Sequence, residues 1–218
     1  MKLFTPALVL LACFVLASCS PKQPGVKAGS ISKKKYEAPG DLFTIAVPQG
    51  EHVKARDAAS GPGAGFISFL DDLGTFYRLQ YSPARGTQRA ELGGEGADDA
   101  YRKILNDEVV NPMRSDSPIS TVLDEEAIQF NGRPAYFAVI QLPGRATVSI
   151  DDGQGNWVRG DDVRAVLLFT HGDEVLTALH SESPIRQAVS PTSDFERIDR
   201  LRKEVMEFAK TIEFKEKR

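Results

Sequence analysis

Cysteine is scarce in this sequence of 218 residues, which contains only Cys13 and Cys19. Cys13 lies inside an apolar N-terminal run, so Cys19 is the single cysteine left once such a run is removed after export. One cysteine cannot form a disulfide within the chain, and a zinc site built on thiolates needs several. The stability of the folded part must therefore come from the packing of a hydrophobic core.

An excess of basic residues is also missing. The chain contains 27 Lys and Arg against 30 Asp and Glu, which gives a formal net charge of −3. Binding to nucleic acid depends on neutralising phosphates with Lys and Arg side chains. We therefore expect no nucleic-acid partner.

Recognisable catalytic motifs are lacking as well. The three histidines, His52, His171 and His180, do not have the His-x-x-x-His spacing of a zinc-binding helix. No Gly-x-Ser-x-Gly elbow occurs, and the glycine-rich stretch 61–65 lacks the Lys and Ser/Thr of a phosphate-binding loop. A Ser-His-Asp site assembled from distant segments stays open, because triads do not need proximity in sequence.

The first 18 residues have the layout of a secretory signal: Lys2, then the apolar run Leu3–Ala17, then small residues. This run of about 15 residues is shorter than the ~20 that a membrane-spanning helix needs. Its end, Leu16-Ala17-Ser18-Cys19, resembles the lipobox of bacterial lipoproteins. The alternative is an ordinary signal peptide that a cysteine happens to follow.

The lipobox resemblance implies a location for the mature chain. In such lipoproteins the signal is cut before the cysteine, whose thiol and new amine carry acyl chains, so a covalent lipid is expected at Cys19. Two or more acyl chains hold a protein firmly on a membrane. Ser20, in place of the Asp that retains enterobacterial lipoproteins in the inner membrane, favours the periplasmic face of the outer membrane.

Composition divides the chain into three parts: a lipoprotein signal peptide (1–18), a flexible tether rich in Pro, Gly, Ser and Lys (19–35), and one globular domain (36–215). Within the domain, two pairs of predicted strands flank tight turns at Asn131-Gly132 and at 171–173. A helix with Tyr101 and Val109 at helical spacing is expected to stop at Pro112. A closing amphipathic helix is expected to begin at Ser193 with a capping box and to bury Phe195, Ile198, Leu201, Val205, Phe208 and Ile212.

This order of elements resembles the PsbP-like fold, which implies an α+β domain with an antiparallel β-sheet covered by helices. The resemblance implies a non-enzymatic accessory tendency and assigns no binding residue. The sequence departs from the family pattern in a long insertion at 143–162. The segments that carry the resemblance are 43–48, Asn131-Gly132-Arg133-Pro134-Ala135-Tyr136, 166–178 and 208–214.

Two features of the insertion are candidates for a site. Carboxylates at Asp151, Asp152, Asp161 and Asp162 offer hard oxygen ligands to Ca²⁺, although the spacing of an EF-hand loop is absent and a solvated turn is the plainer interpretation. Trp157, the only tryptophan, stands among Gly, Asn and Asp residues. There it either packs on the domain or contacts a partner.

The sequence thus predicts a lipid-anchored periplasmic module that binds an envelope partner, without catalysis and without a cofactor beyond the lipid at Cys19. One alternative is an envelope hydrolase with a carboxylate or Ser/His site assembled from loops. A second alternative is a structural lipoprotein that depends on Ca²⁺.

Overall fold

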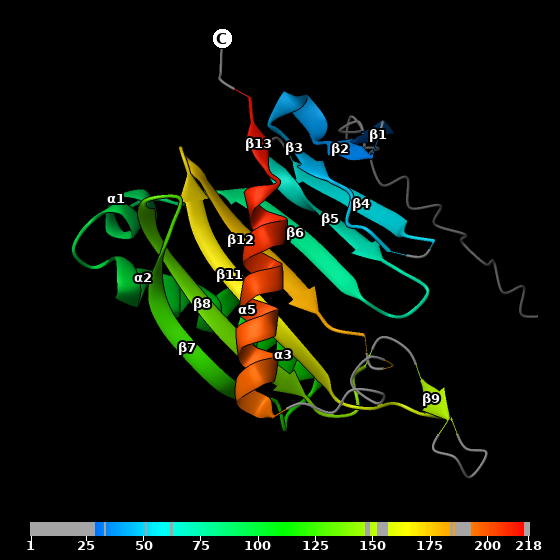
Figure 1. Cartoon of the computed structure of the whole chain (residues 1–218). Helices are drawn as coiled ribbons and strands as arrows, with labels where there is room; N and C mark the ends of the chain where they lie inside the picture. The colour runs from blue at the N-terminus through cyan, green and yellow to red at the C-terminus, as the bar shows by residue number, and fades with distance from the viewer. Residues whose placement is uncertain are drawn as a thin grey trace, which may run out of the picture.

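The computed structural model of the chain describes residues 29–32, 34–50, 52–61, 63–146, 149–151, 157–183, 185 and 193–215. A seven-stranded antiparallel sheet forms its centre (Figure 1). In spatial order the strands of this main sheet are β4 (Lys54–Gly61), β5 (Ala64–Leu70), β6 (Phe76–Pro83), β12 (Glu174–Ser181), β11 (Asp162–His171), β8 (Arg133–Leu142) and β7 (Thr121–Phe130).

Two smaller antiparallel sheets accompany the main one. The four-stranded sheet has the order β1 (Ser30–Ser32), β2 (Lys35–Glu37), β3 (Phe43–Ala46) and β13 (Glu213–Phe214), with the short 3-10 turn η1 (Pro39–Asp41) before β3. Strands β9 (Ile150–Asp151) and β10 (Trp157–Val158) pair with each other.

Helices cover both faces of the main sheet (Figure 1). The long helix α5 (Asp194–Lys210) lies on one face, beside the four-stranded sheet. The other face carries α1 (Gln88–Gly93), α2 (Ala97–Ile104), the π-helical segment η2 (Leu105–Val110) and α3 (Asn111–Asp116). This arrangement confirms the predicted α+β class, an antiparallel sheet covered by helices.

The core has two parts, one on each face of the main sheet. Alternation along β11 supplies both, because Val163, Ala165 and Leu167 face α5 whereas Val166 and Leu168 face α2 and η2. Both faces of β8 and β11 are buried, so these strands are continuous apolar runs instead of alternating ones. The domain is anchored on this central strand pair.

The turn at Asn131-Gly132 forms as predicted. Both residues have positive φ, 51° and 73°, which is the geometry of the two-residue turn that matches the twist of a hairpin. The hairpin of β11 and β12 around 171–173 is confirmed as well.

Helix α5 begins with the predicted capping box, in which the Ser193 hydroxyl accepts from the Glu196 N–H and the Glu196 carboxylate accepts from the Ser193 N–H. Leu201, Val205 and Phe208 are buried against the sheet. Phe195 is an exception, with 80% of its surface exposed. The expectation that it is buried was wrong, because the first turn of α5 is not covered by the sheet.

Three further differences from the sequence-based expectations have local causes. Pro112 does not end the helical region, since it follows the π-helical segment η2 and the backbone stays helical through Asn111 into α3. Strand β4 was not expected, because its polar sequence at the sheet edge lacks apolar alternation. Strand β1 lies within the range predicted as tether, and the part of that range before residue 29 is outside the described residues.

Among the helices that the structure describes, none has the length and apolar character required to span a membrane.

Candidate functional site

The largest cavity that we describe is a cleft of about 950 Å³ at the end of the main sheet. It is lined by the turn between β11 and β12, by η1, and by β3 and β13. Its lining consists of Gly40, Asp41, Leu42, Phe43, Tyr81, His171, Gly172, Asp173, Glu174, Leu176, Phe214 and Lys215.

The floor of the cleft is aromatic and aliphatic. Phe43 packs edge-to-face on Tyr81, with ring centroids 5.1 Å apart, and on Phe214 at 6.2 Å. Leu176 is buried beneath them, and Leu42 is half-buried at the wall. These residues come from β3, β6, β12 and β13, so the floor exists only where the two sheets meet.

His171 closes one side of the cleft. Its imidazole stacks flat on Phe214, with centroids 3.5 Å apart and an angle of 4° between the rings. Burial against this ring, and next the positive charge of Arg133, lower the pKa of His171 below its ordinary value. The neutral imidazole is therefore favoured near pH 7, which leaves this wall uncharged.

The rim of the cleft is polar. Lys215 pairs with Asp41 at 3.0 Å, and this contact raises the pKa of the Lys215 ammonium. On the opposite side, Asp173 pairs with Arg89. An apolar floor within a ring of charges is the usual composition of a small-molecule or side-chain binding site. The rim contains no nucleophile with an adjacent general base among the described residues.

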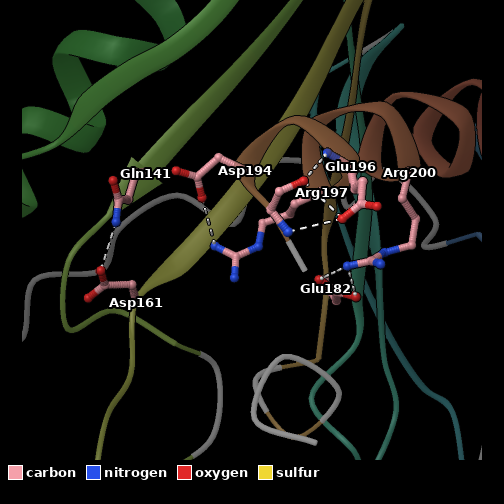
Figure 2. Close-up of polar contacts among 8 residues, drawn as sticks. Gln141, Asp161, Glu182, Asp194, Glu196, Arg197 and Arg200 are labelled. Carbon is pink, nitrogen blue, oxygen red and sulfur yellow. Dashed lines mark hydrogen bonds and ion pairs between the residues drawn. The ribbon is translucent and has the colours of Figure 1, made fainter. Parts of the chain in front are cut away.

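The acidic candidates of the sequence do not converge within the described residues. Asp161 accepts hydrogen bonds from Gln141 Nε2 (2.8 Å) and from the Gly144 N–H (3.1 Å), as Figure 2 shows for Gln141. Asp162 is buried and pairs with Arg164 Nε at 2.7 Å. Burial raises the pKa of Asp162, and Arg164 partly opposes that rise.

The side chains of Asp151 and Trp157, and all of Asp152, lie outside the described residues, as does Cys19. The backbone of Asp151 pairs with that of Trp157 across β9 and β10. In the part of the chain that is described, no group of three or more His, Cys, Asp or Glu side chains is arranged to hold a metal ion. The Ca²⁺ site and the partner contact of Trp157 stay predictions.

The histidines do form acid pairs, but away from the cleft. His52 lies 3.0 Å from Asp72 at an exposed turn. His180 is fully buried in β12, deeper than the half-burial that its place at a strand end suggested, and its Nε2 lies 2.7 Å from Glu204 of α5.

The hydrogen bonds of His180 show which ring nitrogen donates to the backbone. Its Nδ1 lies 3.1 Å from the Phe76 carbonyl, which can only accept, so Nδ1 donates. A hydrogen bond between Nε2 and the Glu204 carboxyl group then requires a second proton. This proton lies either on Nε2, which makes the ring an imidazolium, or on the carboxyl group of Glu204. Because Tyr77 also stacks on this ring at 4.2 Å, His180 ties β6, β12 and α5 together, which is a structural role.

Helix α5 carries a further buried ion pair. Arg200 contacts the carboxylate of Glu182 at 2.7 Å, and the Glu182 side chain has no exposed surface (Figure 2). Near the start of the same helix, Arg197 lies 3.9 Å from Asp194. The Arg200–Glu182 pair joins α5 to the segment that follows β12, whereas the Arg197–Asp194 pair lies within α5, and neither pair borders the cleft.

The cleft could not be found from the sequence. Its lining comes from segments near residues 40, 81, 172 and 214, and no spacing rule connects them. The available signal was the hairpin turn at 171–173, which was interpreted as an ordinary solvated turn.

No family model matches the sequence, and no curated protein matches it at a significant level. Among solved structures, the chain is similar to the cyanobacterial PsbP (CyanoP) of Synechocystis sp. PCC 6803, with 17% identity, 92% of this chain and 99% of that chain covered, and a TM-score of 0.49. A structure from Bacteroides thetaiotaomicron VPI-5482 is similar with 13% identity and a TM-score of 0.44. The matched region covers 86% of this chain and 50% of that chain.

A Pseudomonas aeruginosa protein of unknown function is also similar, with 13% identity, a TM-score of 0.33, and 67% of this chain and 81% of that chain covered. At these identities and TM-scores the likenesses do not place the chain in a family. The α+β architecture rests on the strand order of the chain itself.

Proposed function

We propose that this chain is a lipid-anchored module of the cell envelope that binds an apolar group of an envelope partner in the cleft. The observation that carries the proposal is the composition of the cleft, an aromatic floor with a charged rim. Its volume of about 950 Å³ lies near the upper end of the range for sites that enclose a ligand of drug size. The rim charges would fix the orientation of a group whose apolar part fills the floor.

A neutral fluorescent dye, Nile red, tests the cleft without a known ligand. We expect saturable binding to the full chain, and binding about tenfold weaker or more after Leu42→Glu, because a carboxylate at the wall opposes burial of an apolar probe. The matched control is Leu73→Glu, which places the same charge at an exposed turn outside the cleft. Equal binding by both variants would contradict the proposal.

The anchor is proposed from Leu16-Ala17-Ser18-Cys19. Labelled palmitate should enter the wild-type protein and should not enter Cys19→Ser, and the wild type should sediment with the outer-membrane fraction. Equal labelling of the two proteins would refute lipidation at Cys19. Such a result would leave the cleft proposal unaffected, since the two tests are independent.

A further inference from the structure

A groove on the opposite face of the main sheet is lined by arginines. Two cavities of about 270 Å³ and about 220 Å³ form this groove beside α3, and both are lined by Met113, Asp116 and Arg164. The shared lining makes them neighbours along one face. The cationic side chains of the arginine groove are Arg78, Arg145, Arg159 and Arg164.

Strand alternation places Arg78 and Arg164 on this face. Leu79 of β6 and Ala165 of β11 belong to the core under α5, so their neighbours in sequence face the other way. Strand β12 lies between β6 and β11, and its Leu179 pairs with Arg78. The core residues of α1, α2 and η2 pack on β8, β11 and β12, so Arg78 lies at the border of the covered part of the sheet.

Arg78 has no acidic partner among the described residues. Its guanidinium carbon lies 4.2 Å from the centroid of the Phe66 ring, and its Nε is buried without a hydrogen-bond partner in the described structure. Burial, followed by the positive charge of Arg164, lowers the pKa of Arg78. A half-buried guanidinium that faces a second cation is unfavourable unless an anion joins it.

Arg164 pairs with Asp162 through its Nε. Its guanidinium lies 5.9 Å from the Phe76 centroid while lining both cavities. The terminal nitrogens of Arg164 have no hydrogen bond to a described residue. The two arginines therefore present donors on either side of β12.

The smaller cavity, of about 220 Å³, adds the cationic side chains of Arg145 and Arg159 to the groove. Arg145 donates to the backbone carbonyl of Asp116, and Arg159 is exposed. The acids that line the groove, Glu108 and Asp116, are exposed on η2 and α3 and form no ion pair with these arginines in the described structure. The unpaired charge of the groove is consequently positive, in a chain whose net charge is negative.

We propose that the arginine groove binds the phosphate group of a small ligand between Arg78 and Arg164, with Phe66 and Phe76 beside it. Guanidinium groups donate in pairs to phosphate oxygens, and a phosphate monoester carries close to two negative charges with three strong acceptor oxygens. The same phosphate chemistry occurs in a lipid headgroup and in a soluble ester, and the test separates these sources.

The test uses calorimetric titration with inorganic phosphate, in the full chain with Cys19→Ser so that no acyl chain contributes. We expect saturable binding that weakens with added salt, and binding about tenfold weaker or more in Arg78→Gln. Arg85→Gln is the matched control, because it removes the same charge from an exposed position at the other end of β6. Its affinity for phosphate should equal that of the parent chain.

Absence of saturable binding, or an equal loss in Arg78→Gln and Arg85→Gln, would overturn the proposal. If Arg78→Gln lowers the thermal midpoint strongly, Arg78→Lys takes its place with the same criteria, because it keeps the charge and removes the paired donors of the guanidinium. Co-sedimentation with vesicles that contain phosphatidic acid, whose headgroup is a phosphate monoester, compared with phosphatidylcholine vesicles, then identifies the source. Vesicle binding that depends on Arg78 assigns a lipid headgroup, and vesicle binding that is weak or independent of Arg78 assigns a soluble phosphate ester.

Discussion

At the scale of single residues, His171 is the clearest case in which environment changes chemistry. Its place in a predicted hairpin turn indicated a solvated residue, and His171 is exposed, but its ring also stacks on Phe214 at the wall of the cleft. Phe214 lies about 40 residues further along the chain, so no local sequence pattern predicts the contact between the two rings. The same holds for His180, whose partner Glu204 is contributed by a different element.

His171 should make stability depend on pH. Its pKa in the folded state is lower than the 6.5 of the unfolded chain, so the unfolded state binds the proton more tightly. The stabilisation is fully present above pH 6.5 and is lost as the pH falls through the lowered pKa. We expect the free energy of unfolding to fall less between about pH 8 and about pH 5 in His171→Phe, which keeps a flat ring on Phe214.

Denaturant unfolding at several pH values measures this difference, and an NMR titration of the imidazole measures the pKa directly. In Arg133→Gln the pKa of His171 should rise toward its ordinary value, because Arg133 is the second cause of the shift. A wild type and a His171→Phe variant with the same pH dependence would show that the ring is not desolvated by Phe214.

At the scale of elements, prediction succeeded for the hairpin turns and for the cap of α5, whose signals are local. The turn at Asn131-Gly132 and the capping box at Ser193 are both written in a few adjacent residues, and both form as expected. Prediction failed where contacts with segments distant in sequence determine the local structure or the burial of a side chain. Strand β4 is polar and becomes a strand by pairing with β5 at the sheet edge, and Phe195 fits the apolar period of α5 but lies beyond the sheet.

The turn at Gly132 offers a quantitative test at this scale. Gly132 has φ of 73° and open space where a Cβ atom would lie, so an added methyl group meets backbone strain and no steric contact. Gly132→Ala should lower the free energy of unfolding by about 1 kcal/mol. Denaturant unfolding measures this change.

The control for this test is Gly93→Ala. Gly93 ends α1, also has open space and does not have positive φ. Alanine there should leave stability unchanged or raise it slightly, because it favours the helix. Equal losses in the two variants would show that the hairpin turn is not the cause.

At the scale of the whole molecule, fold class was predictable and the candidate sites were not. Alternation, turns and caps identify strands and helices, and the resemblance of their order to the PsbP-like fold implied the antiparallel sheet covered by helices. The cleft and the arginine groove depend instead on which strands become neighbours. Arg78 and Arg164 are separated by 86 positions in sequence, and only the placement of β12 between β6 and β11 brings them to one groove.

The C-terminal strand β13 gives a final test, because it serves both the small sheet and the cleft. It pairs with β3 through Phe43 and Thr44, and its Phe214 contacts both Phe43 and His171. A chain that ends after Ile212 should lose binding of Nile red and have a lower thermal midpoint. Its far-UV circular dichroism should stay close to that of the full chain, since the main sheet does not include β13.

A chain that ends after Lys215 is the control, because it keeps all residues that line the cleft. It should bind the dye as the full chain does. Dye binding that survives in the chain ending at Ile212 would show that the probe does not occupy this cleft. Since Phe214 and Lys215 line the cleft at the end of the domain, we expect the folding of the C-terminus and binding in the cleft to be coupled.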